Sequence, residues 1–221
     1  MEELRESENI LIIGAPGCGK TTLAKEFMEG KPGLFFSQAV RDRGLADVPV
    51  IHSSKLNSII NQNQFYKICE PLDWDAALKN MYTHYVNGTV YYDDIGQMVS
   101  GNVTKGIKSI MGQVRHNCND QIYSFWNPNH VPPFMYDMMN RILIFKTGVG
   151  PKDLRETDKI PRLEFFKEAM AWVEEQDPIK YKHCYAYMIK DPLNPASKLP
   201  FDYVDPITKV SPHKFYNVRK P

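Results

Sequence analysis

The stretch from Ile10 to Thr22, ILIIGAPGCGKTT, constrains the fold more than any other part of the sequence. Four apolar residues lead into a glycine-rich turn that ends in Lys20 and Thr21, and the turn matches the pattern G-x-x-x-x-G-K-[ST]. In this pattern a strand enters a loop whose backbone N–H groups turn inward around phosphates, and a helix begins at the lysine. A glycine turn that binds nothing is the alternative, but the complete spacing favours a phosphate-binding loop.

The residues of this loop have different expected roles. Lys20 is expected to reach the β and γ phosphates of a nucleotide such as ATP, and Thr21 is expected to supply a hydroxyl to Mg²⁺. Cys18 occupies a variable position, and we interpret it as incidental. The predicted nucleotide-binding residues are Gly14, Ala15, Pro16, Gly17, Cys18, Gly19, Lys20, Thr21 and Thr22.

An acidic pair ends a later apolar run, TVYYDD, at residues 89 to 94. Such a pair at the end of a strand is the arrangement expected of a Walker B site, where one carboxylate holds the Mg²⁺ shell and its neighbour orients the attacking water. We assign Asp93 to the metal side and Asp94 to the water side. A helix cap is the alternative role of the two carboxylates, but the apolar strand before them and the upstream loop favour the catalytic interpretation.

Short apolar runs alternate with amphipathic stretches along the chain, which predicts an α/β domain. Several runs are apolar on both faces, as in a buried and mainly parallel central sheet flanked by helices. Strands are expected at residues 9 to 14, 33 to 38, 64 to 70, 89 to 94, 121 to 126, 141 to 146 and 184 to 191, and helices at 20 to 29, 73 to 86, 103 to 115 and 163 to 176. The polar connection 39 to 63 is assigned no element, and it could carry a subunit contact or a pore loop.

Length and composition favour one main domain. We expect a core at residues 1 to 150, a helix and a strand that complete it at 151 to 191, and an extended tail at 192 to 221, where repeated prolines prevent regular elements.

The net charge of +1 provides no global field toward nucleic acid, so contacts with polyanions would come from local patches or from a ring of subunits. The four cysteines lack the spacing of a zinc site or disulfide framework. No apolar run approaches the roughly 20 residues of a membrane span, and no signal peptide is seen, so we expect a soluble protein.

A third feature lies in residues 113 to 148, which are expected to contain a helix end, a strand, a proline-containing loop, a short helix and another strand. Asn127 follows the first of these strands, and from there it could sense the γ phosphate and position water. Arg115 or Arg141 could act as an arginine finger on the nucleotide of a neighbouring subunit. Alternatively, Asn127 only starts a turn with Pro128, and either arginine is a solvated surface charge.

The order of these elements resembles the FtsK/HerA superfamily of ring-forming ATPases that pump DNA. In that superfamily a helix ends in an arginine, and a strand then leads to a polar sensor, a proline and a second turn before the closing strand. The resemblance covers roughly residues 8 to 148, and its later part is carried by Arg115, Asn127, Pro128, Val131, Pro132 and the run ILIFK. The superfamily usually has Glu where Asp94 stands and Gln where Asn127 stands, so both side chains are one methylene shorter here.

Within the superfamily, the short chain looks most like the genome-packaging ATPases of icosahedral, membrane-containing viruses. The resemblance implies a RecA-like fold, ATP and Mg²⁺ as ligands, a homo-oligomeric ring and double-stranded DNA as partner. It also implies capsid or membrane vertex proteins as possible partners, and a location in the host cytoplasm or at the packaging vertex of the virion.

Two other classes of protein share parts of the pattern. A viral superfamily-three helicase often has two acidic residues in Walker B and an Asn sensor. However, the 73 residues from Lys20 to Asp93 leave room for a strand and a helix that its compact core does not normally have. A nucleotide kinase has the same loop but needs an arginine-rich lid, whereas residues 113 to 148 offer only Arg115 and Arg141.

Overall fold

The computed structural model describes residues 7–38, 43–58, 64–70, 73–97, 102–112, 114–155, 160, 163–175 and 185–189. In this part of the chain, eight strands form one sheet in the order β3-β4-β2-β5-β6-β1-β7-β8. The strands are β1 Asn9–Ile13, β2 Gly33–Phe36, β3 Val50–Ile51, β4 Phe65–Ile68, β5 Thr89–Tyr92, β6 Asp120–Phe125, β7 Arg141–Phe145 and β8 Tyr185–Ile189. The helices are α1 Lys20–Met28, α2 Trp74–His84, α3 Asn102–Gly112, α4 Val114–Asn117, α5 Pro133–Met138 and α6 Leu163–Glu175, with short 3-10 turns η1 Arg43–Leu45, η2 Ser53–Ser58, η3 Ile95–Gln97, η4 Pro128–His130 and η5 Pro151–Asp153.

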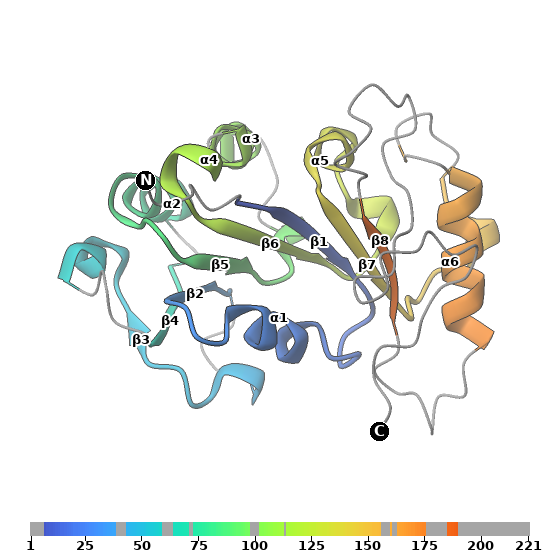
Figure 1. Cartoon of the computed structure of the whole chain (residues 1–221), viewed down its shortest axis with the longest axis horizontal. Coiled ribbons are helices and arrows are strands. Elements are labelled where there is room, and N and C mark those ends of the chain that lie inside the picture. The colour runs from blue at the N-terminus through green and yellow to red at the C-terminus, as the bar shows by residue number, and fades with distance from the viewer. Residues whose placement is uncertain are drawn as a thin grey trace, which may run out of the picture. The chain divides into compact units, whose positions relative to one another are not determined.

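The chain divides into two compact units, and the first contains Met1–Asn9 and Lys20–Ser124. Its strands pair in parallel, β3 with β4, β4 with β2, β2 with β5, and β5 with β6. Helix α1 lies on one side of these strands, and α2, α3 and α4 lie on the other (Figure 1). Helix α2 buries Trp74, Ala77, Leu78 and Met81, which follow the i, i+3, i+4, i+7 spacing of one helix face.

The second unit contains Ile10–Gly19 and Phe125–Pro221. Strand β1 runs parallel to β7, with Ile10 opposite Arg141 and Ile13 opposite Ile144, and β8 runs antiparallel to β7. All five residues of β1 are buried, as expected for a strand inside a parallel sheet. Helix α6 packs on β7 and β8, and its Phe166 contacts Tyr136 of α5 edge to face, with 6.1 Å between ring centroids.

The expected fold class is confirmed: a RecA-like arrangement with a mainly parallel central sheet flanked by helices. Each expected strand and helix is present, with ends that differ by a few residues. The segment 39 to 63, to which the sequence analysis assigned no element, contributes the edge strand β3 and two 3-10 turns. The predicted tail at 192 to 221 lies outside the described residues, and the division into a core, a completing segment and a tail stays a prediction. Among the described helices, none is both long enough and apolar enough to cross a membrane.

Candidate active site

The glycine-rich loop leaves the end of β1 in a conformation that only glycine adopts easily. Gly17 and Gly19 have φ angles of +79° and +103°, in the left-handed region. A Cβ atom on Gly14 would lie 2.6 Å from both Cys18 Sγ and Phe145 Cβ. The Gly14 N–H donates to the carbonyl of Phe125 at 2.9 Å, which anchors the start of the loop. The three glycines of the motif are therefore required by backbone geometry and close packing.

Lys20 is the first residue of α1 and is only 6 % exposed. Its Nζ lies 3.8 Å from Asp94 Oδ1, so the ammonium and one of the predicted catalytic carboxylates face each other. Asp94 Oδ1 is buried, and it accepts no hydrogen bond from the residues that the structure describes. A buried carboxylate oxygen without a hydrogen bond lowers the stability of the folded state unless a charged or hydrogen-bonding group lies beside it.

The acidic pair is held by contacts with its neighbouring strands. The Asp93 N–H donates to the carbonyl of Phe36 in β2 at 2.8 Å, and the Asp94 N–H donates to Ser124 Oγ in β6 at 2.8 Å. The phenol of Tyr91 donates to Asp93 Oδ1 at 3.0 Å, and Ser124 Oγ lies 3.5 Å from the same oxygen. Asp94 itself has a φ of +44°, a left-handed conformation that is uncommon for a residue other than glycine.

Tyr91 links this pair to the start of α1. Burial raises the pKa of the Tyr91 phenol well above its usual value, and the charge of Asp93 raises it further. Hydrogen bonds with the side chains of Ser124 and Thr21 act in the opposite direction. The phenol therefore stays protonated, and it contacts Thr21 as well as Asp93. Sequence analysis did not identify Tyr91 or Ser124. The available signal was the spacing of Tyr91 and Asp93, because residues two apart in a strand share a face.

Asn127 performs the structural role that the sequence analysis considered as an alternative. Its Oδ1 accepts a hydrogen bond from the Asn129 N–H at 2.8 Å and so caps the turn η4, which begins at Pro128. Asn127 is half-buried. Its proposed role in sensing the γ phosphate stays a prediction.

The two arginines lie in different surroundings. Arg115 belongs to α4, but its side chain lies outside the described part of the chain. Arg141 begins β7 opposite Ile10, so it lies at the end of the β1–β7 pair away from Gly14. At about 3.3 Å per residue, this places its Cα about 13 Å from the opposite end of the strand pair, where β1 leads into Gly14. A role for either arginine on a neighbouring subunit stays a prediction.

The side chains near Lys20 fit a Mg²⁺ ion that is held partly by a nucleotide. No group of three or more His, Cys, Asp or Glu residues able to hold a metal occurs among the described residues. Magnesium typically uses one or two carboxylates together with phosphate oxygens and waters, so such a group is not required. The Thr21 hydroxyl and the Asp93 carboxylate would supply oxygen ligands of the kind that Mg²⁺ prefers.

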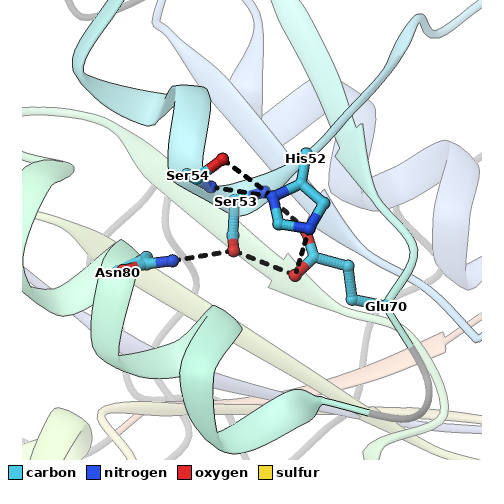
Figure 2. Close-up of polar contacts among 5 residues, drawn as sticks. All are labelled: His52, Ser53, Ser54, Glu70 and Asn80. Atoms are coloured by element: carbon cyan, nitrogen blue, oxygen red, sulfur yellow. Dashed lines mark hydrogen bonds and ion pairs between the residues drawn. The ribbon is translucent and has the colours of Figure 1, made fainter.

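A second polar cluster lies beyond β3 and β4 in the first unit (Figure 2). Glu70 accepts hydrogen bonds from the backbone N–H of Ser53 at 2.5 Å and from its Oγ at 2.9 Å. Asn80 of α2 donates to the same Oγ at 3.0 Å, and His52 Nε2 lies 3.7 Å from Glu70 Oε2. The cluster ties η2 to the end of β4 and to α2, and sequence analysis did not identify it.

Comparison with known proteins gives structural relatives alone. No protein-family model matches the sequence, and no curated protein matches it significantly. The genome packaging NTPase B204 of Sulfolobus turreted icosahedral virus 2, solved with sulfate, is similar in fold. The TM-score is 0.62 at 15% identity, and the match covers 83% of this chain and 91% of that one. Its complex with AMPPCP has a TM-score of 0.58 at 17% identity, covering 84% and 92% of the two chains.

A further structure of B204, described as the DNA-packaging ATPase of Sulfolobus turreted icosahedral virus, has a TM-score of 0.56 at 17% identity. That match covers 83% of this chain and 92% of the other. At these identities the comparisons establish a shared fold. The resemblance inferred from the sequence is thus confirmed at the level of structure, because the similar structures include packaging ATPases.

Proposed function

We propose that this protein is a Mg²⁺-dependent ATPase that assembles into a ring and moves double-stranded DNA, as in the packaging of a viral genome. The observation that carries the ATPase proposal is the position of Lys20, which begins a helix after a glycine loop and faces Asp94 at 3.8 Å. A buried lysine beside a carboxylate pair is suited to neutralise phosphate charge where water is activated.

Each residue of the site has a defined role in this proposal. The backbone N–H groups of Gly14 to Gly19 surround the phosphates, and Lys20 contacts the β and γ phosphates. Thr21 and Asp93 would hold Mg²⁺, and the ion would supply positive charge against the phosphate oxygens. Asp94 accepts a hydrogen bond from the attacking water and orients it toward the γ phosphate.

The DNA-moving part of the proposal is supported by the overall likeness to the packaging ATPases. The similar region covers nine tenths of those chains and most of this one, so it is not limited to the nucleotide loop. A ring would give each nucleotide a neighbouring subunit, which could supply Arg115 or Arg141 to the transition state. It would also gather local basic patches around DNA, which the net charge of +1 on one chain does not provide.

The test is ATP turnover measured without nucleic acid, with duplex DNA, and with single-stranded DNA or RNA. The Lys20→Ala variant would give the background rate of ATP turnover. Mass photometry in the presence of ATP would show the oligomeric state. We expect an oligomer whose turnover is stimulated by duplex DNA. Stimulation by single strands alone, accompanied by unwinding, would contradict the packaging proposal in favour of a helicase. A monomer that phosphorylates a small acceptor would instead indicate a nucleotide kinase.

A further inference from the structure

We propose that Tyr91 and Ser124 are positioning residues that set the geometry of the metal and water carboxylates before nucleotide binds. Tyr91 joins Thr21 to Asp93, and Ser124 fixes the backbone of Asp94. This inference rests on the proposed ATPase function, because it assigns Thr21 and Asp93 to Mg²⁺. It adds two residues that lie outside the nucleotide loop and the acidic pair.

The Tyr91 phenol contacts residues of two separate segments. Tyr91 lies in β5 two residues before Asp93, so both side chains emerge on the same face of the strand. Its hydroxyl donates to Asp93 Oδ1 at 3.0 Å and contacts the side chain of Thr21 in the first turn of α1. One phenol therefore bridges the two residues that would hold the metal.

This bridge is buried in the core. Tyr91 is fully buried, and its ring packs edge to face on Phe35 with 5.8 Å between centroids. A packed aromatic ring cannot follow a moving carboxylate, so the direction of its O–H is set by the core. Partners of this kind around a metal site orient its ligands, and changing them typically costs 10- to 100-fold in metal affinity or activity.

Ser124 is fully buried in β6. Its Oγ accepts the hydrogen bond from the Asp94 N–H at 2.8 Å, directly at the residue whose φ is +44°. A left-handed conformation of a residue other than glycine is strained, and it persists only where surrounding contacts enforce it. Ser124 provides such a contact, and the resulting turn directs the Asp94 carboxylate toward Lys20.

Tyr92 offers a matched control for Tyr91. It is the next residue of β5, it is also fully buried, and it stacks on Tyr123 with 4.9 Å between ring centroids. However, its hydroxyl has no hydrogen-bond partner among the described residues. Tyr91→Phe and Tyr92→Phe therefore remove the same atom from equally buried rings, and only the first removal breaks the link to Asp93.

The experiment measures the affinity of a fluorescent ADP analogue, with Mg²⁺ and with EDTA, in wild type, Tyr91→Phe, Tyr92→Phe and Ser124→Ala. For Tyr91→Phe we expect the affinity in EDTA to be unchanged. The increase in affinity on adding Mg²⁺ should be about tenfold smaller than in wild type. Tyr92→Phe should match wild type in both conditions. Ser124→Ala should lower kcat for ATP at least about tenfold with little change in KM, because it disturbs the residue that orients water.

Two results would overturn the inference while the proposed function stands. The first is that Mg²⁺ raises the nucleotide affinity of Tyr91→Phe as much as that of Tyr92→Phe. The second is that Ser124→Ala keeps the wild-type kcat. If Tyr91→Phe does not fold, the kcat of Ser124→Ala decides alone. If wild type neither binds the ADP analogue nor hydrolyses ATP, the proposed function itself is wrong. The two failures are therefore distinguishable.

Discussion

The Nζ of Lys20 and the Oδ1 of Asp94 lie 3.8 Å apart, and this pair connects the start of α1 with the acidic end of β5. A lysine that is only 6 % exposed needs a counter-charge, because an unpaired buried ammonium is strongly disfavoured. Asp94 supplies such a charge. In the proposed mechanism a bound γ phosphate would compete for the same ammonium, and Asp94 would then orient water.

Replacing Lys20 by Ala should abolish ATP hydrolysis, because the ammonium that contacts the transferred phosphate is lost. We expect turnover to fall at least about 100-fold, as for other charge-stabilising donors at a reaction centre. The control is Lys25→Ala on the same helix, whose Nζ pairs with Asp47 at 2.9 Å rather than with the acidic pair. A steady-state phosphate-release assay compares them, and turnover in Lys20→Ala equal to that in Lys25→Ala would contradict the role of Lys20.

Replacing Gly14 by Ala should disturb the nucleotide loop. The added Cβ would lie 2.6 Å from Cys18 Sγ and Phe145 Cβ, and overpacking of this kind typically costs about 1–3 kcal/mol in the free energy of unfolding. Gly148→Ala is the matched control, because among the described residues no heavy atom beyond its chain neighbours lies within 4 Å of the added Cβ. Chemical denaturation and nucleotide binding would be measured for both variants. Loss of stability or binding in Gly148→Ala but not in Gly14→Ala would refute the packing argument.

The contribution of Glu70 to stability should exceed that of His52. Glu70→Ala removes the acceptor for both the backbone N–H and the hydroxyl of Ser53 in a half-buried cluster, so the free energy of unfolding should fall by about 1–3 kcal/mol. His52 is 64 % exposed at its side chain and lies 3.7 Å from Glu70, so His52→Ala should cost less than about 1 kcal/mol. Urea denaturation gives both values, and equal losses would show that the ion pair matters as much as the hydrogen bonds.

The pair formed by Lys25 and Asp47 should make a small contribution that depends on pH. The hydrogen bond from Lys25 is the largest cause that lowers the pKa of Asp47 below its usual 3.8. A lowered pKa in the folded state means that the stabilisation is present above pH 3.8 and is lost as the pH falls through the folded value. The difference in Tm between wild type and Lys25→Met should therefore shrink on acidification. A difference in Tm that grows as the pH falls would contradict the lowered pKa of Asp47 in the folded state.

If Arg115 acts on a neighbouring subunit, Arg115→Ala should bind nucleotide normally and hydrolyse it poorly. Mixing it with the Lys20→Ala variant, which retains the arginine, should restore part of the turnover, because some interfaces then combine an intact loop with an intact Arg115. Removal of a transition-state arginine costs about 10³- to 10⁵-fold in turnover, so even partial rescue is measurable. Absence of rescue in confirmed mixed oligomers would exclude this role, and the same experiment with Arg141→Ala would test the other candidate.

Much of the fold could be predicted from the sequence because its signals are local. The glycine loop, the apolar strands around it and the start of α1 at Lys20 follow from short-range backbone and burial preferences, and all appear as expected. The edge strand β3 was missed because it has only two residues and Val50 is 54 % exposed, so it lacks a burial pattern. The antiparallel direction of β8 depends on the chain path rather than on local sequence.

The chemical groups of the candidate site can be named from the sequence: the loop glycines, Lys20, Thr21 and the acidic pair. How these groups are held depends on the tertiary structure. The contacts of Tyr91 with Thr21 and Asp93, and of Ser124 with Asp94, join residues from separate elements. Burial in a close-packed core allows one orientation for each of these side chains, and no local pattern encodes that orientation.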